Sequence, residues 1–465
     1  MDPLDASVAE LERVLGPSKV DARIETRESH TRDESEADGV VPRAVVLATS
    51  ADDVALALST CRSHGVPVFP RAAGSGRTGG AVPTRPGIVL ATVGMNQIEE
   101  IDRENLLCVV QPGVITGRLH EAVEAEGLFY PPDPNSQDMC AIGGNVAENA
   151  GGPRAFKYGV TREYVLGLEA ITMDGTRLQT GKRTVKGVTG YDVTALLVGS
   201  EGTLAVFTRA TLRLIPKPTA VRTLLGTFHS AIDAGRAVSA IVARGIVPRC
   251  LELLDTECCV VLRESGAHAL PPDVGAMLLI EVDGEAGSLD ASMERVGEAC
   301  ADCAAIDVLV AQHEGERSRL WAARRGMSGA LRGRAKFKLS EDIVVPRSKV
   351  GEMIARVQDL GERHGLRLPT YGHAGDGNLH VNFLWDDADG KARVDQAIEE
   401  TFRLTLAFGG TLSGEHGIGI MKRPYLSLEQ SPALIDLQRR IKSVFDPDGL
   451  LNPDKIFPAA GHGAC

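Results

Sequence analysis

The stretch Gly372-His373-Ala374-Gly375-Asp376-Gly377-Asn378-Leu379-His380-Val381-Asn382 decides how the second half of this chain folds. Asp376-Gly377 at its centre is a strong signal for a two-residue hairpin turn, because the mirror-type turn requires positive φ at both central positions. Pairing outward from that turn places His380 opposite His373, with their Cβ atoms roughly 4.5–5.5 Å apart on one face. Strand alternation places Asn382 on the face of His380. We therefore expect a β-hairpin that presents two imidazoles side by side.

A third imidazole and a carboxylate follow the hairpin. The segment Ser413-Gly414-Glu415-His416-Gly417 is too rich in glycine to form a helix, so we expect a loop. Two histidines and a glutamate, with coordination positions left open, form a donor set that suits zinc or another borderline divalent cation. The sequence therefore predicts a metal site with His373, His380 and Glu415 as ligands. The alternative is a polar hairpin whose histidines only form hydrogen bonds.

Composition and charge narrow the class of protein. The 465 residues are 43% hydrophobic, and a chain of this length exceeds one core, so we expect two or three domains. The net charge of −12 argues against nucleic acid or an anionic membrane as the main partner. The acidic N-terminus lacks the regions of a secretory signal, and no apolar run approaches the ~20 residues that span a bilayer. We expect a cytoplasmic protein and leave open its attachment to a membrane through a partner.

The nine cysteines are scattered and odd in number, which indicates reduced thiols in a reducing compartment. Cys300-x-x-Cys303 has no second pair beside it, and Cys258 and Cys259 are adjacent, so we interpret these residues as ordinary parts of helices or strands. The sequence also lacks the four-cysteine run of an iron–sulfur protein.

The first half begins as a β-α-β unit and continues into a glycine-rich loop. Gly74-Ser75-Gly76-Arg77-Thr78-Gly79 matches the dinucleotide fingerprint G-x-G-x-x-G, but that fingerprint requires a following helix. Pro83, Pro86 and Gly87 follow instead, so a nicotinamide-binding Rossmann fold is rejected. What remains is a loop whose amides can form an anion-binding nest. The expected elements before it are a helix over Val8–Leu15, a strand over Ala44–Ala48, a helix begun by Ser50 and Asp53 and ended at Gly65, and a strand over Val66–Phe69.

Beyond the loop the periodicity predicts further short strands and one long irregular segment. Residues 130–153 contain several Gly and Pro pairs, and an irregular segment of this length is usually functional. Pro216 and Pro218 mark a boundary. The expected elements are strands over Ile88–Thr92, Ile98–Ile101, Leu107–Gln111, Val165–Thr172, Tyr191-Asp192 and Leu197–Leu204, and a helix from Thr116, as its cap, through Glu126.

The second half alternates strands and helices. Helices on one side of an antiparallel sheet would make an α+β, ferredoxin-like domain. The expected helices are Ser230–Arg244, Ser288–Cys300, Arg317–Arg332, one capped by Ser348, Val394–Phe408 and Pro432–Phe445, and the expected strands besides the hairpin are Ala276–Glu281 and Ile343–Pro346.

The motifs along the whole chain resemble those of a known family and occur in the same order. Residues 41–218 resemble the flavin-binding domain of the vanillyl-alcohol oxidase/p-cresol methylhydroxylase superfamily, and residues 220–457 resemble the C-terminal domain of FAD-linked oxidases. Within it the pattern is similar to D-lactate dehydrogenases, the flavoprotein subunit of glycolate oxidase and D-2-hydroxyglutarate dehydrogenase. The motifs that carry the resemblance are the Arg71–Gly80 loop, Gln111-Pro112-Gly113, Gly143-Gly144-Asn145, Gly151-Gly152, Lys157-Tyr158-Gly159, Gly190-Tyr191-Asp192, Gly199–Thr203, Gly372–His380, Gly414–Gly417 and Leu451–Lys455.

The resemblance implies an α+β architecture: an N-terminal helix and loop (1–40), a two-subdomain FAD-binding domain of the p-cresol methylhydroxylase type (41–218), a ferredoxin-like cap (219–440), and a tail (441–465) that returns to the flavin. FAD is expected to be non-covalent, because no histidine lies in the Arg71–Gly80 loop. Ala72 and Ala73 stand where many members have glycine, which negative φ would accommodate. The implied FAD-binding residues are Arg71, Ala72, Ala73, Gly74, Ser75, Gly76, Thr78, Gly79, Pro112, Gly113, Pro132, Asp133, Gly143, Gly144, Asn145, Asn149, Gly151, Gly152, Tyr158, Gly159, Glu201, Gly202 and Asn452.

The implied reaction is the oxidation of a small D-2-hydroxy acid to the 2-oxo acid. His373, His380 and Glu415 would bind a metal, with Zn²⁺ expected and Mn²⁺ or Fe²⁺ as alternatives, and the two histidines would thereby hold the substrate. His416 would take the hydroxyl proton, since an imidazole pKa of about 6.5 suits a base near neutral pH. Asn382 and Arg324 would contact the substrate, although without the resemblance we would interpret Arg324 as a solvated helix residue. Lys336 or Lys338 would supply a second cation.

Other functions stay open at the level of sequence. The D-2-hydroxyglutarate dehydrogenases are the first alternative, and the same scaffold with other chemistry, such as an alkyl-glycerone-phosphate synthase or an aromatic-alcohol oxidase, is the second. A metal hydrolase without flavin and a non-enzymatic metal-binding subunit are the others. Without an internal iron–sulfur motif, electrons would leave to oxygen, a quinone, a carrier flavoprotein or a separate iron–sulfur subunit. The sequence also allows a homodimer.

Overall fold

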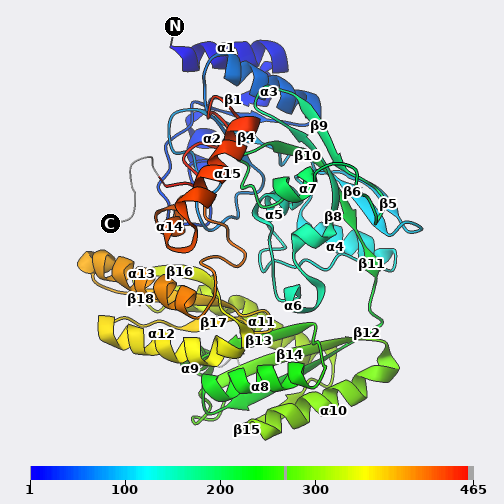
Figure 1. Ribbon diagram of the computed structural model, residues 1–465, viewed down its shortest axis with the longest axis vertical. Coiled ribbons are helices and arrows are strands. Elements are labelled where there is room, and N and C mark those ends of the chain that lie inside the picture. The colour runs from blue at the N-terminus through cyan, green and yellow to red at the C-terminus, as the bar shows by residue number, and fades with distance from the viewer. Residues whose placement is uncertain (1, 266–269, 459–465) are drawn as a thin grey trace. The chain divides into compact units, whose positions relative to one another are not determined.

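The computed structural model describes residues 2–265 and 270–458, which form two compact units (Figure 1). The first unit contains residues 1–151, 160–217 and 415–465, and the second contains residues 152–159 and 218–414. Both units are therefore assembled from separate segments of the chain. Residues 1 and 459–465, at the ends of the predicted terminal segments, lie outside the described residues. The predicted domain boundaries stay predictions.

The first sheet of the first unit contains the expected β-α-β unit. It consists of β1 (Val20–Asp21), β2 (Ala44–Leu47), β4 (Ile88–Ala91) and β3 (Val68–Arg71) in that order, with β2 and β3 both parallel to β4. Helix α3 (Ala51–Ser63) connects β2 to β3 and begins with a capping box, as predicted, in which the side chains of Ser50 and Asp53 each accept the other's backbone N–H. Helix α1 (Pro3–Leu15) packs its apolar side chains against the core of this sheet.

A second, antiparallel sheet completes the two-sheet architecture of the first unit. Its order is β5 (Ile98–Asp102), β6 (Leu107–Val110), β10 (Val206–Arg213), β8 (Val165–Ile171) and β9 (Arg177–Gly181). The remaining elements are α2 (Ile24–Ser29), α4 (Thr116–Ala125), α5 (Ile142–Glu148), α7 (Val193–Leu197), α14 (Leu426–Glu429), α15 (Pro432–Phe445), and the pair β7 (Leu128–Phe129) and β11 (Ile215–Pro216).

Several sequence predictions in the first unit are wrong. The segment 130–153 is not fully irregular, because α5 forms across Gly143 and Gly144 despite their low helix propensity. The strands predicted at Tyr191-Asp192 and Leu197–Leu204 are absent, and Asp192 instead caps α7 by accepting from Ala195 N–H. Thr116 does not cap α4, because its buried hydroxyl contacts Cys140 and accepts from Asn145. Strand β10 was not predicted.

The C-terminal segment returns to the first sheet. After α15, the backbone of Val68 in β3 donates to the carbonyl of Leu450 and accepts from the N–H of Asn452. Leu451 is fully buried in the same core as β2, β3 and α3. Within the described residues the tail therefore packs on the edge strand β3, and its predicted approach to the flavin stays a prediction.

The second unit is organised around one antiparallel sheet. Within the described residues its order is β15 (Ala305–Val310), β12 (Ala220–Phe228), β14 (Ala276–Gly284), β13 (Cys250–Leu254), β17 (Thr370–His373), β18 (Asn378–Trp385) and β16 (Phe337–Val344). The strands at the centre are almost continuously buried, which requires cover on both faces.

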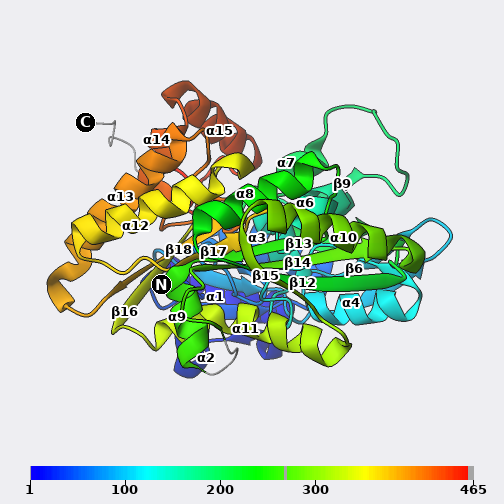
Figure 2. The ribbon, with the colours of Figure 1, turned by 90° about the horizontal axis from the view of Figure 1, so that it is seen from below.

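Helices cover both faces of this sheet, so the expectation of helices on one side is wrong in that detail. Helices α10 (Ala286–Asp302), α8 (Ala231–Ala243), α12 (Val350–His364) and α13 (Lys391–Ala407) form a row in which neighbours pack together (Figure 2). Cys300 of α10 lies on the face of Gly226, whereas Met327 of α11 (Glu314–Arg332) packs on the opposite face with Leu225. Helix α9 (Thr256–Glu264) shares the face of α11, and α6 (Ala155–Tyr158) also belongs to this unit. The cap of α12 is Lys349 instead of Ser348.

In the part of the chain that the structure describes, no helix is both long and apolar enough to cross a membrane. The eight cysteines in that part are all free thiols, as expected from their spacing.

Candidate active site

The hairpin of β17 and β18 presents His373 and His380 on one face, but in a different register from the predicted one. Ala374–Gly377 forms a four-residue turn, so His373 pairs with Asn378 and His380 pairs with Tyr371. The shift is by two residues, and a shift of two keeps every side chain on its own face. The two imidazoles are therefore diagonal neighbours, with ring centroids 5.4 Å apart and perpendicular planes.

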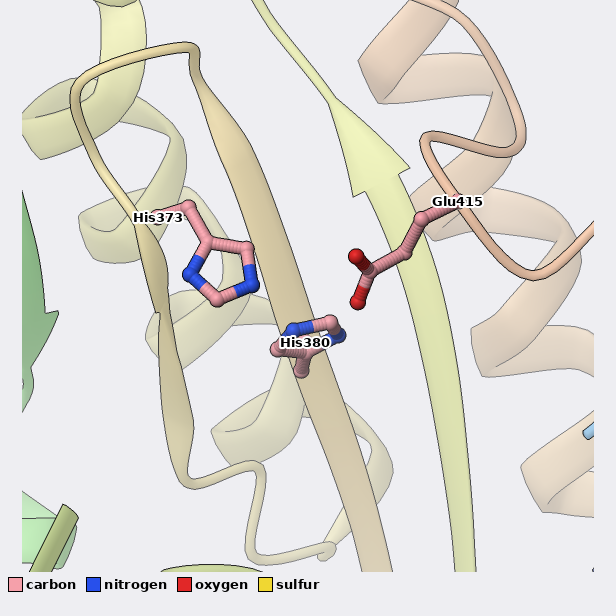
Figure 3. Close-up of side chains that lie close together, drawn as sticks. All are labelled: His373, His380 and Glu415. Atoms are coloured by element: carbon pink, nitrogen blue, oxygen red, sulfur yellow. The ribbon is translucent and has the colours of Figure 1, made fainter. Parts of the chain in front are cut away.

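Glu415 completes a group of three side chains that can hold a metal ion. One ligand atom each from His373, His380 and Glu415 lie within 4.8 Å of one another, and both histidines are buried. Figure 3 shows the two rings and the carboxylate turned toward a common point. Two histidines and one glutamate are a known donor set for a cation that keeps coordination positions open. The residues present therefore fit the predicted metal.

A buried carboxylate on the neighbouring strand holds His373. Glu252 of β13 pairs with His373 across the sheet, and its Oε1 lies 2.6 Å from Nδ1 of that ring. Its Oε2 lies 2.6 Å from Nη2 of Arg324 on α11. Burial alone would raise the pKa of Glu252, but the charge of Arg324 and the contact with His373 outweigh it and hold the pKa below its ordinary value.

The loop that carries Glu415 is fixed by a second buried acid. Asp342 of β16 lies opposite His380, and its Oδ2 accepts from Ser413 Oγ at 3.0 Å and from Gly414 N–H at 2.9 Å. Glu415 is the next residue, so these bonds limit where its carboxylate can lie. Asn378 also donates to Asp342.

Sequence reasoning missed both Glu252 and Asp342. A signal was present for Glu252, because it is an acidic residue inside the otherwise apolar segment Cys250-Leu251-Glu252-Leu253-Leu254, whereas Asp342 follows Ser340 and Glu341 and gave no such signal. A buried carboxylate is costly unless it is paired, so such residues predict a partner on an adjacent element.

The residues predicted to contact substrate lie on the same side of the sheet as His373 and His380. Asn382 follows His380 by two positions in β18, and among the described residues no donor reaches its buried Oδ1. Arg324 is 5% exposed, so it is not a solvated helix residue. Lys338 is buried in β16 on the face of Asn382 and donates to Ser328 at 2.9 Å, whereas Lys336 precedes the strand and is exposed.

His416 lies beside Glu415, the predicted metal ligand, with Nε2 3.7 Å from the carboxylate Oε1. Its side chain is 17% exposed, so it is accessible without being a surface group. Its backbone carbonyl accepts from Thr78 Oγ1 at 2.9 Å, which anchors the loop at this point.

The predicted FAD-binding loop carries a buried guanidinium. In this loop, no acceptor among the described residues reaches Nη1 of Arg71, and burial lowers the pKa of that group while Asp33 partly offsets the effect. Gly74 has φ of +71°, and a Cβ there would collide with the guanidinium of Arg71. Neither Ala72 nor Ala73 has positive φ, as their methyl groups require. A buried, unsatisfied cation beside a glycine-rich loop suits a pyrophosphate group.

Other predicted FAD-binding residues have structural partners that the sequence did not reveal. Gly113 approaches three carbonyls too closely for a side chain, and Gly143 N–H donates to Pro112. Tyr158 belongs to the second unit, where its hydroxyl donates to Asp283 at 2.7 Å. The remaining hydrogen bonds run from the Asn145 amide to the Thr116 hydroxyl, from Arg162 N–H to the Asn149 amide oxygen, from the His120 ring to the Pro132 carbonyl, and from the Asn452 amide to the carbonyls of Gly80 and Glu201.

Two glutamates, Glu201 buried and Glu148 half-buried, lie in the same unit as the glycine-rich loop. The carboxylate of Glu201 accepts the backbone N–H groups of Ile418 and Gly419. Burial raises the pKa of Glu201, and these two N–H groups oppose the shift. Burial and the neighbouring Glu201 raise the pKa of Glu148 well above its ordinary value. Glu148 was not among the predicted site residues.

Comparisons with known proteins agree with this architecture. A family model described as FAD linked oxidases, C-terminal domain, matches residues 217–456, and one described as FAD binding domain matches residues 42–181. Glycolate oxidase subunit GlcD of Bacillus subtilis (strain 168) is 42% identical over 450 residues, 96% of each chain. D-lactate dehydrogenase of Anaerostipes hadrus is 34% identical over 95% of each chain. D-2-hydroxyglutarate dehydrogenase of Stutzerimonas stutzeri (strain A1501) is 31% identical over 98% of this chain and 99% of that protein.

The fold has solved counterparts. p-Cresol methylhydroxylase with substrate bound superimposes with a TM-score of 0.82, covering 98% of this chain and 96% of that one at 15% identity. A likeness at this identity concerns the fold alone, and it confirms the predicted type of FAD-binding fold. From the matched family models and the relatives that align along almost the whole chain, the protein belongs to the FAD-linked oxidases.

Proposed function

We propose that this protein oxidises a small D-2-hydroxy acid of the D-lactate or glycolate type to the 2-oxo acid, with FAD and a divalent metal, Zn²⁺ by preference. The observation that carries the proposal is the group of His373, His380 and Glu415 in a member of the FAD-linked oxidases. Three ligands leave open positions, which a hydroxyl and a neighbouring carboxylate oxygen can share. The names of the relatives support the same substrate class.

The cofactors supply chemistry that side chains lack. A bound divalent cation lowers the pKa of an oxygen that it coordinates, and bound FAD accepts a hydride. His373, His380 and Glu415 would hold the cation, and Arg71 with the glycine-rich loop would contact the pyrophosphate of FAD. We expect FAD to be non-covalent.

The chain's own residues orient the substrate and move its proton. His416 stands next to Glu415 and would accept the hydroxyl proton at Nε2. Asn382 offers a buried amide oxygen that can accept a hydrogen bond. Arg324 has five N–H donors and gives only part of them to Glu252, so it can also bind a substrate carboxylate.

A second candidate is the oxidation of D-2-hydroxyglutarate, which carries another carboxylate. The observation that favours it is Lys338, a buried cation on the same face as Asn382. Lys338 is therefore the better of the two lysines for this role, because Lys336 lies outside the strand. The name of one relative, D-2-hydroxyglutarate dehydrogenase, supports the same candidate substrate.

We further propose an external electron acceptor or an iron–sulfur subunit as partner. The sequence has no four-cysteine run that could carry electrons onward, and the Bacillus subtilis relative is itself named a subunit.

The test is anaerobic mixing of the purified protein with D-lactate, glycolate and D-2-hydroxyglutarate while the flavin absorbance is recorded. We expect a yellow protein whose colour bleaches with at least one of these acids. A colourless protein would favour a metal hydrolase or a metal-binding subunit. A yellow protein that none of them reduces would point to other chemistry on the same scaffold.

The His416→Ala variant tests the proposed base. It should keep its flavin and its metal but lose at least about 100-fold in the rate of flavin reduction, the contribution of a general base. Single-turnover mixing measures that rate directly. Reduction at the rate of the unmodified protein would reject His416 as the base.

A further inference from the structure

We propose that Glu252 is a positioning residue that fixes His373 as a metal ligand and Arg324 as a substrate-binding group through one carboxylate. The proposal rests on the proposed metal site. Glu252 is not one of the three grouped side chains; its Oε1 contacts His373 and its Oε2 forms an ion pair with Arg324.

The three groups come from three elements. Glu252 of β13 and His373 of β17 are direct neighbours across the sheet, and Arg324 reaches the same carboxylate from α11. The carboxylate is fully buried, and each of its oxygens lies 2.6 Å from one partner. The guanidinium of Arg324 also lies over the ring of Tyr371, 4.6 Å from its centroid. Packing and charge therefore hold all three groups in one geometry.

The contact decides which nitrogen of His373 can bind metal. An ionised carboxylate only accepts hydrogen bonds, so Nδ1 of His373 must carry the hydrogen that Glu252 accepts. Nε2 is then the ring nitrogen that has the lone pair, and the nitrogen of His373 nearer to His380 and Glu415 points toward them (Figure 3). A carboxylate behind a metal-bound histidine sets its tautomer and orientation in many metal sites.

The carboxylate of Glu252 also connects the proposed metal ligand His373 to Arg324, the proposed substrate-binding group. Arg324 balances the buried negative charge, without which Glu252 would be strongly destabilising. Because both partners share one side chain, the metal ligand and the guanidinium cannot move independently. Glu252 thus sets the separation of the two groups that would contact a 2-hydroxy acid.

The neighbouring strand offers a matched control. Glu281 of β14 lies on the same face, is 1% exposed, and accepts from Arg317 and Trp321 of the same helix α11, each at 2.6 Å. It does not contact His373, His380 or Glu415 in the contacts recorded for the described residues. Glu281→Gln therefore removes a buried charge of the same kind without touching the metal site.

The experiment compares the dissociation constant of Zn²⁺ in the full-length protein and in the Glu252→Gln and Glu281→Gln variants, by competition with a chromophoric chelator. Glutamine replaces one of the two carboxylate oxygens with an NH2 group, so either His373 or Arg324 would face a donor instead of an acceptor. We expect Glu252→Gln to weaken Zn²⁺ binding by about 10- to 100-fold and Glu281→Gln to leave it unchanged. The visible spectrum of bound Co²⁺ should change in Glu252→Gln only, and FAD content should stay the same in all three proteins.

Equal metal affinity in the unmodified protein and Glu252→Gln would overturn the proposal, as would an equal loss in both variants or a protein that binds no metal at all. If Glu252→Gln does not fold, Glu252→Asp, which keeps the charge but shortens the reach, must still weaken Zn²⁺ binding. The outcome of this metal-binding experiment can be told apart from the outcome for the proposed function. Metal binding that depends on Glu252 in a protein that no hydroxy acid reduces would support this inference and reject the function.

Discussion

Arg71 lies in the first unit with one nitrogen of its guanidinium, Nη1, buried and without an acceptor among the described residues. Leaving a buried charged donor unsatisfied costs roughly 1–3 kcal/mol or more, so such groups usually have a ligand. The motif predicted that this loop binds an anion, but only the structure shows which side chain is left without a partner.

Replacing Arg71 with methionine should weaken FAD binding. A hydrogen bond to a charged group contributes about 1.5–3 kcal/mol, so the dissociation constant of FAD should rise roughly 10- to 100-fold. The measurement is the fluorescence recovered when FAD is titrated out of the deflavinated variant. Arg77→Met, in the same loop but exposed, is the control and should bind FAD normally. Equal affinity in both variants would contradict the assignment.

Asp255 provides a test of pH dependence at a single residue. It caps α9, accepts the N–H groups of Cys258 and Thr370, and is fully buried, and burial raises its pKa to about 6. The pKa of an unfolded aspartate is about 3.9, so the folded state binds the proton more tightly. Its contribution to the free energy of unfolding is therefore complete below pH about 4 and is lost as the pH rises through about 6.

The difference between the unmodified protein and Asp255→Asn should show this dependence. The free energy of unfolding of the unmodified protein minus that of Asp255→Asn should fall by roughly 3 kcal/mol between pH about 4 and pH about 7. Urea unfolding at several pH values measures it. A difference that stays constant over this range would show that Asp255 titrates normally.

At the scale of the element, the hairpin of β17 and β18 shows what a sequence pattern can and cannot predict. The alternation of side chains correctly placed His373, His380 and Asn382 on one face, because the period of two is a property of any strand. The register was wrong, because the turn includes Ala374 and Gly375 as well as Asp376-Gly377. A cross-strand partner such as Glu252, 121 positions away from His373, could not be predicted from local periodicity.

Gly372 of β17 lies too close to β18 for a side chain, so Gly372→Ala should disrupt the hairpin. A Cβ there would lie 2.8 Å from Cα of Leu379 and still nearer the carbonyl of Asn378. We expect a loss of about 1–3 kcal/mol in the free energy of unfolding, the cost of overpacking, together with weaker metal binding. Urea unfolding and metal analysis test both effects.

Gly297→Ala is the control at the same scale. Gly297 lies in α10 with open space around it, so alanine should stabilise the protein by roughly 0.5–1 kcal/mol through helix propensity. A Gly372→Ala protein as stable as the unmodified protein would contradict the close approach at Gly372, and destabilisation by Gly297→Ala would show that Gly297 is a poor control.

At the scale of the whole molecule, the order of motifs predicted an FAD-binding part followed by a C-terminal part, and the comparisons confirm it. It could not be predicted that each unit would be built from separate segments of the chain. Residues 152–159 belong to the second unit, where Lys157 and Tyr158 contact Asp283 and Phe156 lies against Gly375 and Arg347. These contacts join positions more than a hundred residues apart, and no periodicity encodes them.

The most direct test is whether reduction of the flavin by a 2-hydroxy acid needs the cation that we propose His373, His380 and Glu415 to hold. The protein is mixed anaerobically with D-lactate or glycolate as purified, after removal of metal by a chelator, and after Zn²⁺ is restored. We predict that the flavin bleaches in the first and third samples, and that removal of the cation slows bleaching at least about 100-fold while FAD stays bound. Bleaching at the same rate in the metal-free protein would contradict the account.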